Sequence, residues 1–345
     1  MARKKSGVTI HDVAAAAGVS VSTVSRVLND KDDVAAETYD DVRRVIAELG
    51  YTSSLAARSM RSHKTNVIGL VMPDLEQPFC INVVKGINRV IEQLEYDLLV
   101  YTGGDSSAST WAAREQQYVS LLNGSITDGV IVVAPHAKTF STKFPLVAID
   151  PHLDSTDFHA VISTNCVGAK SAMDYLLNLG HRRIGFICGR PDLQSAKRRL
   201  EGYQESLRQA NLPIDPDLIQ PGEFIQASGY QGAKKLLALP NPPTAIFAAN
   251  DETAIGAIDA ITEAGLRVPY DLSIVGFDNI EEAPYFNGGL TTVDQSLNEM
   301  ASIAVKTLLE LIQGKPVENK LQRVSTRLIV RNTCQAIEPD KVAIM

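Results

Sequence analysis

The chain reads Thr9-Ile-His-Asp-Val-Ala-Ala-Ala-Ala-Gly-Val-Ser-Val-Ser-Thr-Val-Ser-Arg-Val-Leu-Asn29 near its N-terminus, and this stretch predicts two short helices joined by a tight turn. Thr9 and Asp12 have the spacing of a capping box, in which two side chains satisfy free backbone N–H groups. The alanine run favours a helix, and Gly18 supplies the left-handed conformation that ends it. Ser20 is a favourable N-cap for the second helix.

This second helix has two unlike faces. Val24, Val27 and Leu28 share an apolar face that we expect to pack inside the domain. An arginine on the other face can donate two hydrogen bonds to O6 and N7 of guanine, and residues near the helix start reach base edges in the major groove. Capping and periodicity alone also fit a helical hairpin without a ligand. The opposite, polar face carries Val21, Ser22, Ser25, Arg26 and Asn29.

A third amphipathic helix follows, so residues 1–50 predict a small bundle. Val42, Val45, Ile46 and Leu49 have helical spacing, and Gly50 ends the run.

The charge of the chain is unevenly distributed. The 345 residues carry a net charge of −7, which excludes indiscriminate coating of nucleic acid or anionic lipid. Residues 1–64 hold ten Lys and Arg against eight Asp and Glu, and the remaining residues hold 23 against 32. Six of the eight acids lie within Asp30–Asp41, which we expect to be a loop facing away from phosphates. The charges indicate nucleic-acid contact restricted to the N-terminal end.

The composition is that of a protein with several domains in the cytoplasm. Hydrophobic residues make up 45% and charged residues 21%, as in ordinary globular proteins. No apolar stretch approaches 18 residues and the N-terminus has no apolar signal core, so we expect no membrane segment and no secretion. Four cysteines, Cys80, Cys166, Cys188 and Cys334, form no close pair, which argues against structural zinc and a disulfide framework.

The remainder of the chain contains an internal repeat. Residues 67–100 predict a strand, a loop, a helix opened by Gly86 and a second strand, and residues 183–210 repeat this order. Gly69 and Gly86 are 17 residues apart, as are Gly185 and Gly202. The continuous apolar runs indicate parallel strands buried on both faces. Alternating strands and helices therefore predict two doubly wound α/β lobes that enclose a cleft at the carboxyl ends of their strands.

Polar side chains follow several of these apolar runs. Asp150, Asp278 and Asn250-Asp251 come directly after predicted strands, and Ser195 and Arg199 lie near a helix start. Phe79 and Phe224 lie in predicted loops, where an aromatic ring can stack on a sugar ring. Carboxylates, an amide and an arginine suit the recognition of adjacent hydroxyl groups. For any one acid, strand-end capping or an ion pair is the alternative explanation.

The sequence shows no recognisable catalytic or metal-binding pattern. The histidines have no metal-ligand spacing, and Gly103-Gly104 lacks the spacing of a phosphate-binding loop. No nucleophile elbow, catalytic triad or pair of catalytic carboxylates is evident, so we expect no enzyme, no catalytic residues, no metal and no cofactor. Trp111 lies in a polar helical stretch and is predicted to be at the surface or at an interface.

The segments Val8-Thr-Ile-His-Asp-Val-Ala14 and Val19-Ser-Val-Ser-Thr-Val-Ser-Arg-Val-Leu-Asn29 resemble the headpiece of the lactose/galactose-repressor (LacI/GalR) family of transcriptional regulators. The resemblance extends from about Thr9 to Thr333. It implies that Val21, Ser22 and Arg26 read bases. It also implies phosphate contacts, which set register rather than sequence, from Thr9, Ser20, Thr23, Ser25 and Asn29.

Residues 51–64 have the composition of a flexible linker, but Leu-Ala-Ala-Arg-Ser-Met at 55–60 resembles the hinge helix of the family. That helix lies in the minor groove, and a short helix of this kind would order only when two copies pair on DNA. The family usually has Leu at the position that parts a base step, where this chain has the more flexible Met60. The implied DNA contacts are Leu55, Ala56, Arg58 and Met60.

The resemblance also implies a two-lobed, periplasmic-binding-protein-like body over 65–335. One lobe would comprise about 65–163 and 292–322 and the other about 164–291 and 323–335, followed by a tail at 336–345. Where the family commonly has Asp-Asn, this chain has Thr164-Asn165, so a carboxylate is absent near the lobe junction. The implied effector contacts are Phe79, Asp150, Ser195, Arg199, Phe224, Asn250 and Asp278, with Gln295 a weaker match.

The sequence therefore predicts a ligand-responsive repressor of carbohydrate metabolism genes. It would act as a homodimer or a dimer of dimers on a pseudo-palindromic double-stranded operator, with a sugar or sugar derivative bound between the lobes. A sugar-binding protein without a regulatory role is the alternative, and an enzyme acting on sugars is a third. The effector, the operator and the sign of the response are left open by these residues.

Overall fold

The computed structural model describes residues 8–51, 64–103, 108–122, 124, 126–152 and 157–337. The chain forms two compact units: Met1–Thr65 together with Gly124–Ile126, and the remainder, which we call the body. Most of the predicted linker and nearly all of the tail, at 52–63 and 338–345, lie outside the described residues.

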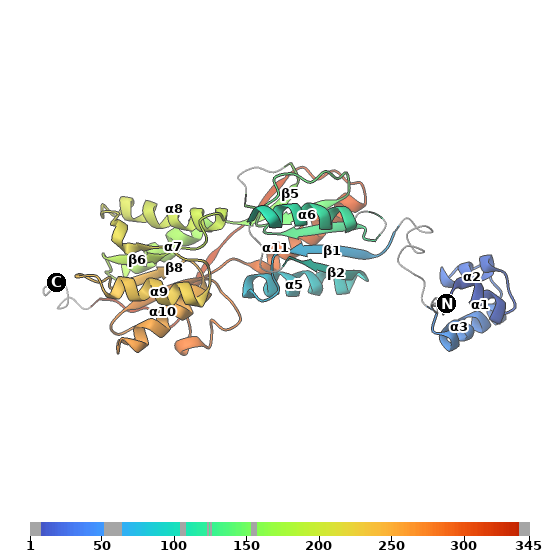
Figure 1. Cartoon of the computed structure of the whole chain (residues 1–345), viewed down its shortest axis with the longest axis horizontal. Coiled ribbons are helices and arrows are strands. Elements are labelled where there is room, and N and C mark those ends of the chain that lie inside the picture. Colours follow the sequence, from blue (N-terminus) through green and yellow to red (C-terminus); the bar gives the residue numbers. More distant parts are fainter. Residues whose placement is uncertain are drawn as a thin grey trace, which may run out of the picture. The chain divides into compact units, whose positions relative to one another are not determined.

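The N-terminal unit contains three helices, α1 (Ile10–Ala16), α2 (Val21–Leu28) and α3 (Ala36–Leu49) (Figure 1). The predicted capping box is present, because the Asp12 carboxylate accepts from the Thr9 backbone N–H at 2.8 Å and the Thr9 hydroxyl accepts from the Asp12 N–H. Ser20 caps α2 by accepting from the Thr23 N–H at 3.1 Å, and Gly50 ends α3 in the left-handed conformation. These three predictions are confirmed.

The three helices enclose a small core. The acidic segment at 30–41 was predicted to be a loop, but its second half is helical. Since α3 begins at Ala36, half of the acids in this segment lie on the helix, and only the first three lie before it. Asp30 ties the helices together by accepting from Tyr39 and, at 2.7 Å, from Arg43. The buried core residues are Val13, Ala14, Val24, Val27, Val42, Val45 and Tyr51.

The body contains two six-stranded sheets, one in each lobe, as the repeat predicts. In the N-lobe the order is β11-β5-β4-β3-β1-β2 and in the C-lobe it is β12-β10-β9-β8-β6-β7. The N-lobe strands are β1 (Val67–Met72), β2 (Asp97–Thr102), β3 (Gly129–Val133), β4 (Leu146–Ile149), β5 (His159–Ser163) and β11 (Leu321–Val324). The C-lobe strands are β6 (Ile184–Ile187), β7 (Ile219–Gln220), β8 (Ala245–Ala248), β9 (Ser273–Asp278), β10 (Thr292–Asp294) and β12 (Arg327–Ile329).

The two orders are equivalent strand for strand, which explains the repeat in the sequence. The predicted partners β1 and β6 occupy the same place in their sheets, as do β3 and β8, and β4 and β9. All pairings described are parallel except that of β10 with β12 at the edge of the C-lobe.

Helices cover both faces of each sheet (Figure 1). Two of them pack together on one face of the N-lobe sheet and one on the other, whereas the C-lobe has a pair on each face. The N-lobe helices are α5 (Pro78–Ile91) with α11 (Leu297–Ile312), opposite α6 (Ala108–Leu122); the C-lobe pairs are α7 (Asn165–Asn178) with α8 (Gln194–Gln209), and α9 (Gln226–Leu237) with α10 (Asp251–Glu263). Short 3-10 helices are η1 (Glu92–Leu94), η2 (Pro216–Leu218) and η3 (Phe286–Gly288).

The prediction that Trp111 lies at the surface or at an interface is wrong. Its side chain is 3% exposed and packs between α6 and the sheet with Val71, Val130 and other residues. Gly103 makes the room, because a Cβ atom there would lie 1.8 Å from the indole ring. The polar neighbours of Trp111 along α6 concealed its burial.

The chain crosses between the lobes near 163–165, 294–297 and 324–327. The predicted boundaries at 292 and 323 were too early, because β10 completes the C-lobe sheet and β11 continues through Val324 in the N-lobe sheet. At the junction, the Thr326 N–H donates to Thr164 Oγ1 at 3.0 Å, and the two hydroxyls are also 3.0 Å apart. Thr164 thus joins two crossings where the family commonly has a carboxylate.

Candidate functional site

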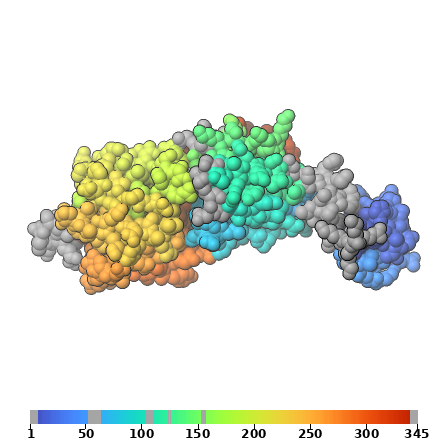
Figure 2. Space-filling model, in the orientation of Figure 1, coloured from blue at the N-terminus to red at the C-terminus, as the bar shows by residue number. Residues whose placement is uncertain are grey.

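One pocket between the lobes of the body brings together the residues predicted to bind an effector. The lobes lie against each other in the space-filling view (Figure 2). Strand ends of both sheets supply the pocket wall, as expected for doubly wound folds. Phe79 is on α5 rather than in the predicted loop, and Gln295 is on a crossing between lobes. The predicted residues that line the pocket are Phe79, Asp150, Ser195, Arg199, Phe224, Asn250, Asp278 and Gln295.

The backbone turns sharply where three of these residues lie. Asp150, Phe224 and Asp278 have positive φ angles of 50°, 65° and 113°. Non-glycine residues rarely adopt this region, and such conformations concentrate at functional sites. Two of these turns place Asp150 directly after β4 and Asp278 at the end of β9, where both side chains line the pocket.

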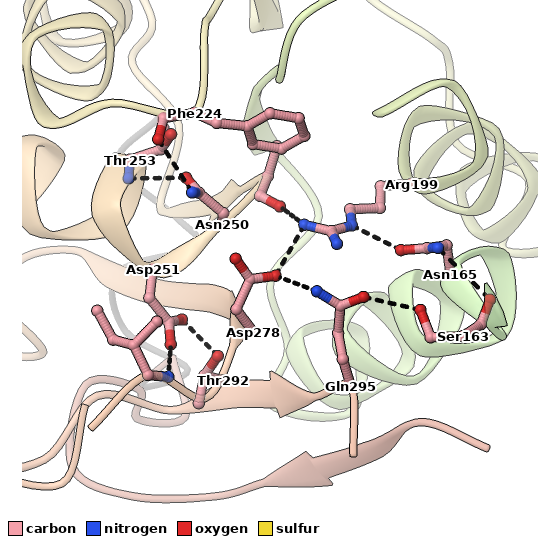
Figure 3. Close-up of polar contacts among 12 residues, drawn as sticks. Ser163, Asn165, Arg199, Phe224, Asn250, Asp251, Thr253, Asp278, Thr292 and Gln295 are labelled. Atoms are coloured by element: carbon pink, nitrogen blue, oxygen red, sulfur yellow. Dashed lines mark hydrogen bonds and ion pairs between the residues drawn. The ribbon is translucent and has the colours of Figure 1, made fainter. Parts of the chain in front are cut away.

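Arg199 is the centre of a buried polar network (Figure 3). Its Nε donates to Asn165 Oδ1 at 2.9 Å and its Nη1 donates to the Ala249 carbonyl at 2.5 Å. Nη1 also lies 3.1 Å from Asp278 Oδ1, with the two side chains 3% and 6% exposed. The guanidinium stacks on Phe277, with its carbon 3.8 Å from the ring centroid. Two nitrogens and one face of the guanidinium are therefore held.

The network continues into the lobe junction. Gln295 Nε2 donates to Asp278 Oδ1 at 2.6 Å, and Gln295 Oε1 accepts from Ser163 Oγ at 2.8 Å. Asn165 and Gln295 lie at two of the three crossings, so the ion pair in the pocket is hydrogen-bonded to both (Figure 3). A movement of Arg199 or Asp278 is thus transmitted to the crossings between the lobes through one further side chain, Asn165 or Gln295.

Burial dominates the electrostatics of the pocket carboxylates. It raises the pKa of Asp150 to about 6, while Arg199 and a hydrogen bond from Ser195 oppose the shift. Burial likewise raises the pKa of Asp278, against the effect of Arg199. Asp150 therefore titrates close to neutral pH.

Asn250 and its neighbour Asp251 have different tasks. Asn250 Oδ1 caps α10 by accepting from the Thr253 N–H at 2.9 Å, and its Nδ2 donates to the Phe224 carbonyl at 3.1 Å. Asp251 is fully buried outside the pocket, where it accepts from the Ile280 N–H at 2.9 Å and from Thr292. Its role is to join neighbouring strand ends of the C-lobe.

Among the pocket residues missed from the sequence are two histidines and an arginine: His136, His152 and Arg190. They follow β3, β4 and β6 within three residues, so the strand-end rule that found Asp150 would also have found them. His136 Nε2 lies 3.3 Å from Asp192 Oδ2 of the opposite lobe, and Arg190 Nη2 donates to the same oxygen at 2.7 Å. The pocket therefore has a second polar wall.

The DNA-contact candidates of the N-terminal unit divide into exposed side chains and caps. Ser22, Arg26 and Asn29 are exposed on one side of α2, opposite the buried Val24 and Val27. Val21 instead packs partly against the core. Thr9, Ser20 and Thr23 make capping contacts, and Asn29 donates to the Ser25 carbonyl at 2.6 Å. The hinge candidates Leu55, Ala56, Arg58 and Met60 lie outside the described residues.

The acidic turn before α3 lies beside the exposed side of α2. Asp33 Oδ2 is 3.4 Å from Arg26 Nη1, and both side chains are more than half exposed. The prediction that this segment faces away from phosphates stays a prediction, and its Asp33 pairs with the residue predicted to read guanine.

Within the described part of the chain, no group of three His, Cys, Asp or Glu side chains is arranged to hold a metal ion. No helix there is long and apolar enough to cross a membrane.

Comparison with known proteins joins these two parts. Residues 9–54 match the family described as "Bacterial regulatory proteins, lacI family", and residues 173–334 match the "Periplasmic binding protein-like domain". The ribose operon repressor of Haemophilus influenzae is 35% identical, over 90% of this chain and 93% of that protein. The repressor PurR of Pasteurella multocida is 33% identical, over 95% and 99%. The lac repressor dimer bound to operator and the anti-inducer ONPF has a TM-score of 0.84 and 29% identity, covering 96% of this chain and all of that chain.

A helix-turn-helix unit and a two-lobed body with a polar pocket between its lobes define a ligand-responsive DNA-binding regulator. The chain belongs to the LacI family of transcriptional regulators. The predicted fold class and family are thereby confirmed, and the homologues are transcriptional repressors rather than enzymes.

Proposed function

We propose that this repressor is controlled by an uncharged polyhydroxyl effector, a sugar or a sugar derivative, that binds the eight predicted pocket residues. One observation carries the proposal: the buried Arg199–Asp278 pair inside the pocket is hydrogen-bonded to Asn165 and Gln295 at two crossings between the lobes. A ligand that rearranges this ion pair acts directly on the crossings between the lobes, and effector binding is thereby coupled to lobe movement.

The charges of the pocket favour a neutral ligand. Arg199 is paired with Asp278 and Arg190 with Asp192, which leaves the carboxylate of Asp150 as the additional charge. An anionic effector would meet this carboxylate, whereas hydroxyl groups would donate to it. Phe79 and Phe224 offer ring faces for the apolar side of a sugar.

On the DNA side, two copies of the chain would read a pseudo-palindromic operator in the cytoplasm. Val21, Ser22 and Arg26 would contact bases, and Thr9, Ser20, Thr23, Ser25 and Asn29 would contact phosphates. The exposed positions of Ser22, Arg26 and Asn29 on α2 support this assignment. Leu55, Ala56, Arg58 and Met60 would contact the minor groove between the half-sites.

A thermal-shift screen of the full chain against pentoses, hexoses, hexuronates and ribonucleosides would identify the effector. A mobility-shift titration on DNA selected from a random pool then measures operator affinity with and without it. We expect a neutral sugar to raise the melting temperature and to change operator affinity. Asp278→Asn, which keeps the side-chain shape, should abolish both responses, whereas Asp259→Asn on the distant part of α10 should preserve them. A ligand that binds the body and leaves operator affinity unchanged would refute the gating.

A further inference from the structure

The second wall of the pocket contains two histidines of the N-lobe that the proposed function leaves without a role. His136 and His152 both line the pocket, and their rings meet edge to face with centroids 4.4 Å apart. The His136 side chain is 12% exposed. The Nδ1 atoms of both rings are buried and have no hydrogen-bond partner among the described residues. Buried polar atoms are rarely left in this state unless a ligand or water satisfies them.

The charge state of His136 follows from its surroundings. Burial lowers the pKa of His136, so the ring is neutral at pH 7. Asp192 remains a carboxylate, because hydrogen bonds from Arg190 and His136 outweigh burial and lower its pKa to about 2. A carboxylate only accepts hydrogen bonds, so the single proton of neutral His136 lies on Nε2, 3.3 Å from Asp192. Nδ1 therefore carries a lone pair.

The other groups around the ring do not supply a proton to Nδ1. Glu115 Oε1 lies 3.9 Å from His136 Nδ1, beyond hydrogen-bond distance. Burial raises the pKa of Glu115 to about 7, but both of its oxygens already accept hydrogen bonds from backbone N–H groups. The backbone N–H groups of His136 and Ala137 donate to it at 3.0 Å and 2.8 Å, which fixes the loop that carries His136. His152 is also neutral, since burial lowers its pKa to about 3, and its ring is hydrogen-bonded to the backbone of Ala134.

We propose that His136 is an effector-contacting residue whose Nδ1 accepts a hydrogen bond from a hydroxyl or N–H group of the effector while its Nε2 donates to Asp192 across the cleft. The inference rests on the proposed function and adds a specificity-determining residue to it. A donor at Nδ1 polarises the ring and strengthens the bond from Nε2 to Asp192, because hydrogen bonds in a chain reinforce one another. Effector recognition in the N-lobe is thereby coupled to a contact with the C-lobe.

The wall also selects against acidic effectors. Arg190 donates two hydrogen bonds to Asp192, at 3.2 Å and 2.7 Å, so the positive charge of Arg190 is neutralised. The unpartnered Nδ1 atoms of His136 and His152 repel an anion. A donor-bearing neutral group fits this wall, whereas a carboxylate or phosphate does not.

The first test needs no effector. Nitrogen NMR of the full chain labelled on histidine reports which ring nitrogen carries the proton, with His136→Ala used to assign the signal. At pH 7 we expect His136 as the Nε2–H tautomer in the wild type and a mixture of tautomers in Asp192→Asn. A proton on Nδ1, or a charged ring, would overturn the proposal.

The second test uses calorimetry with the neutral sugar or nucleoside found in the screen and its monodeoxy analogues. His136→Ala should weaken binding about fivefold to tenfold, the size of one hydrogen bond. One deoxy analogue should bind the wild type more weakly than the parent compound but bind His136→Ala equally well, which shows that the hydroxyl and the ring interact. His159→Ala is the matched control, since His159 also has a buried unpartnered Nδ1 but lies in β5 outside the pocket.

The two levels of the hypothesis fail differently. A wild type that binds no member of the screen refutes the proposed effector class, whatever the tautomer of His136. A wild type that binds while His136→Ala binds equally well refutes the role of His136 alone. The same refutation follows if each deoxy analogue loses as much affinity in His136→Ala as in the wild type.

Discussion

Two arginines define the two ends of this regulator, and their surroundings are opposite. Arg26 on α2 has a side chain that is 58% exposed and one ion pair of 3.4 Å to an equally exposed Asp33. Arg199 on α8 is 3% exposed and is fixed by Asn165, the Ala249 carbonyl and Asp278. Exposed pairs contribute little and exchange partners easily, whereas breaking a buried pair leaves an uncompensated charge. The N-terminal unit therefore exposes its arginine to solvent, whereas the body buries its own arginine in the pocket.

The largest effect is expected at Arg199. Arg199→Ala leaves Asp278 buried without its partner and should lower the free energy of unfolding of the body by about 3–5 kcal/mol. Urea unfolding of the full chain, followed by circular dichroism, measures the change. Arg198→Ala is the control on the same helix, because Arg198 is 45% exposed and pairs with Glu201. Equal losses in the two variants would remove the contrast between buried and exposed arginines.

Arg26 should affect recognition without affecting the fold. Arg26→Ala should cost about 1–3 kcal/mol of discrimination at one base pair and leave the melting temperature unchanged. Binding to a selected operator and to its single-base variants tests this, with Arg44→Ala as the control because Arg44 pairs with Asp41 and Glu48 on α3. A uniform loss of affinity across all sequences would make Arg26 a phosphate contact.

Asp150 gives effector binding in the pocket a dependence on pH. In the proposed complex the effector's hydroxyl groups donate to the Asp150 carboxylate, and burial raises the pKa of Asp150 in the free protein to about 6. Effector affinity should therefore rise with pH and level off above about 7, with a loss of about tenfold per pH unit below about 6. Calorimetry between pH 5 and 8 measures the profile. Asp150→Asn should flatten it, and an unchanged slope in that variant would assign the titration elsewhere.

The raised pKa of Asp150 also affects the free energy of unfolding of the ligand-free body. The unfolded chain ionises Asp150 near the ordinary pKa of 3.8, before the folded protein does. The free energy of unfolding should therefore fall as the pH rises from about 4 to about 6. Asp251 and Asp278 contribute with the same sign, because burial raises their pKa as well. The contribution of Asp150 is the difference between the wild type and Asp150→Asn.

Local signals predicted most of the fold. The capping box at Thr9, the cap at Ser20 and the stop at Gly50 depend on residues within four positions of one another, so sequence alone specifies them. The repeat of Gly69 and Gly185 predicted two equivalent sheets, because the chain was duplicated strand by strand. The edges of the lobes were less predictable, since β10 and β11 are short strands at crossings and their partners come from distant segments.

The pocket was predictable where a strand ends in a polar residue and hidden where contacts span the lobes. Asp150 and Asp278 follow apolar runs directly, whereas His136 and Asp192 meet only because two loops 56 positions apart face each other. Trp111 was misplaced because its burial depends on Gly103, which precedes it by eight positions in a different element. Long-range packing of this kind leaves no periodic signal.

The smallest effect is expected at the exposed ion pair between Arg26 and Asp33. Asp33 Oδ2 lies 3.4 Å from Arg26 Nη1 in the turn before α3, and in the proposed complex DNA would displace it before the guanidinium reaches a base. Asp33→Asn should tighten non-specific binding by about fivefold at most, because the loss of a negative charge helps every phosphate contact. Operator binding should tighten by less, because the variant also loses the ion pair that orients Arg26. Specificity should fall accordingly.

Asp32→Asn separates the ion pair from the net charge, since it removes a carboxylate from the same turn and leaves the pair intact. Filter binding over a series of salt concentrations, on operator and random DNA, compares the two variants. If Asp33 orients Arg26, only Asp33→Asn reduces the difference in affinity between operator and random DNA. If both variants narrow it equally, the turn acts through charge alone and the ion pair has no part in recognition. Because the pair is exposed, either difference should disappear at high salt, whereas the pocket pair of Arg199 and Asp278 should be indifferent to it.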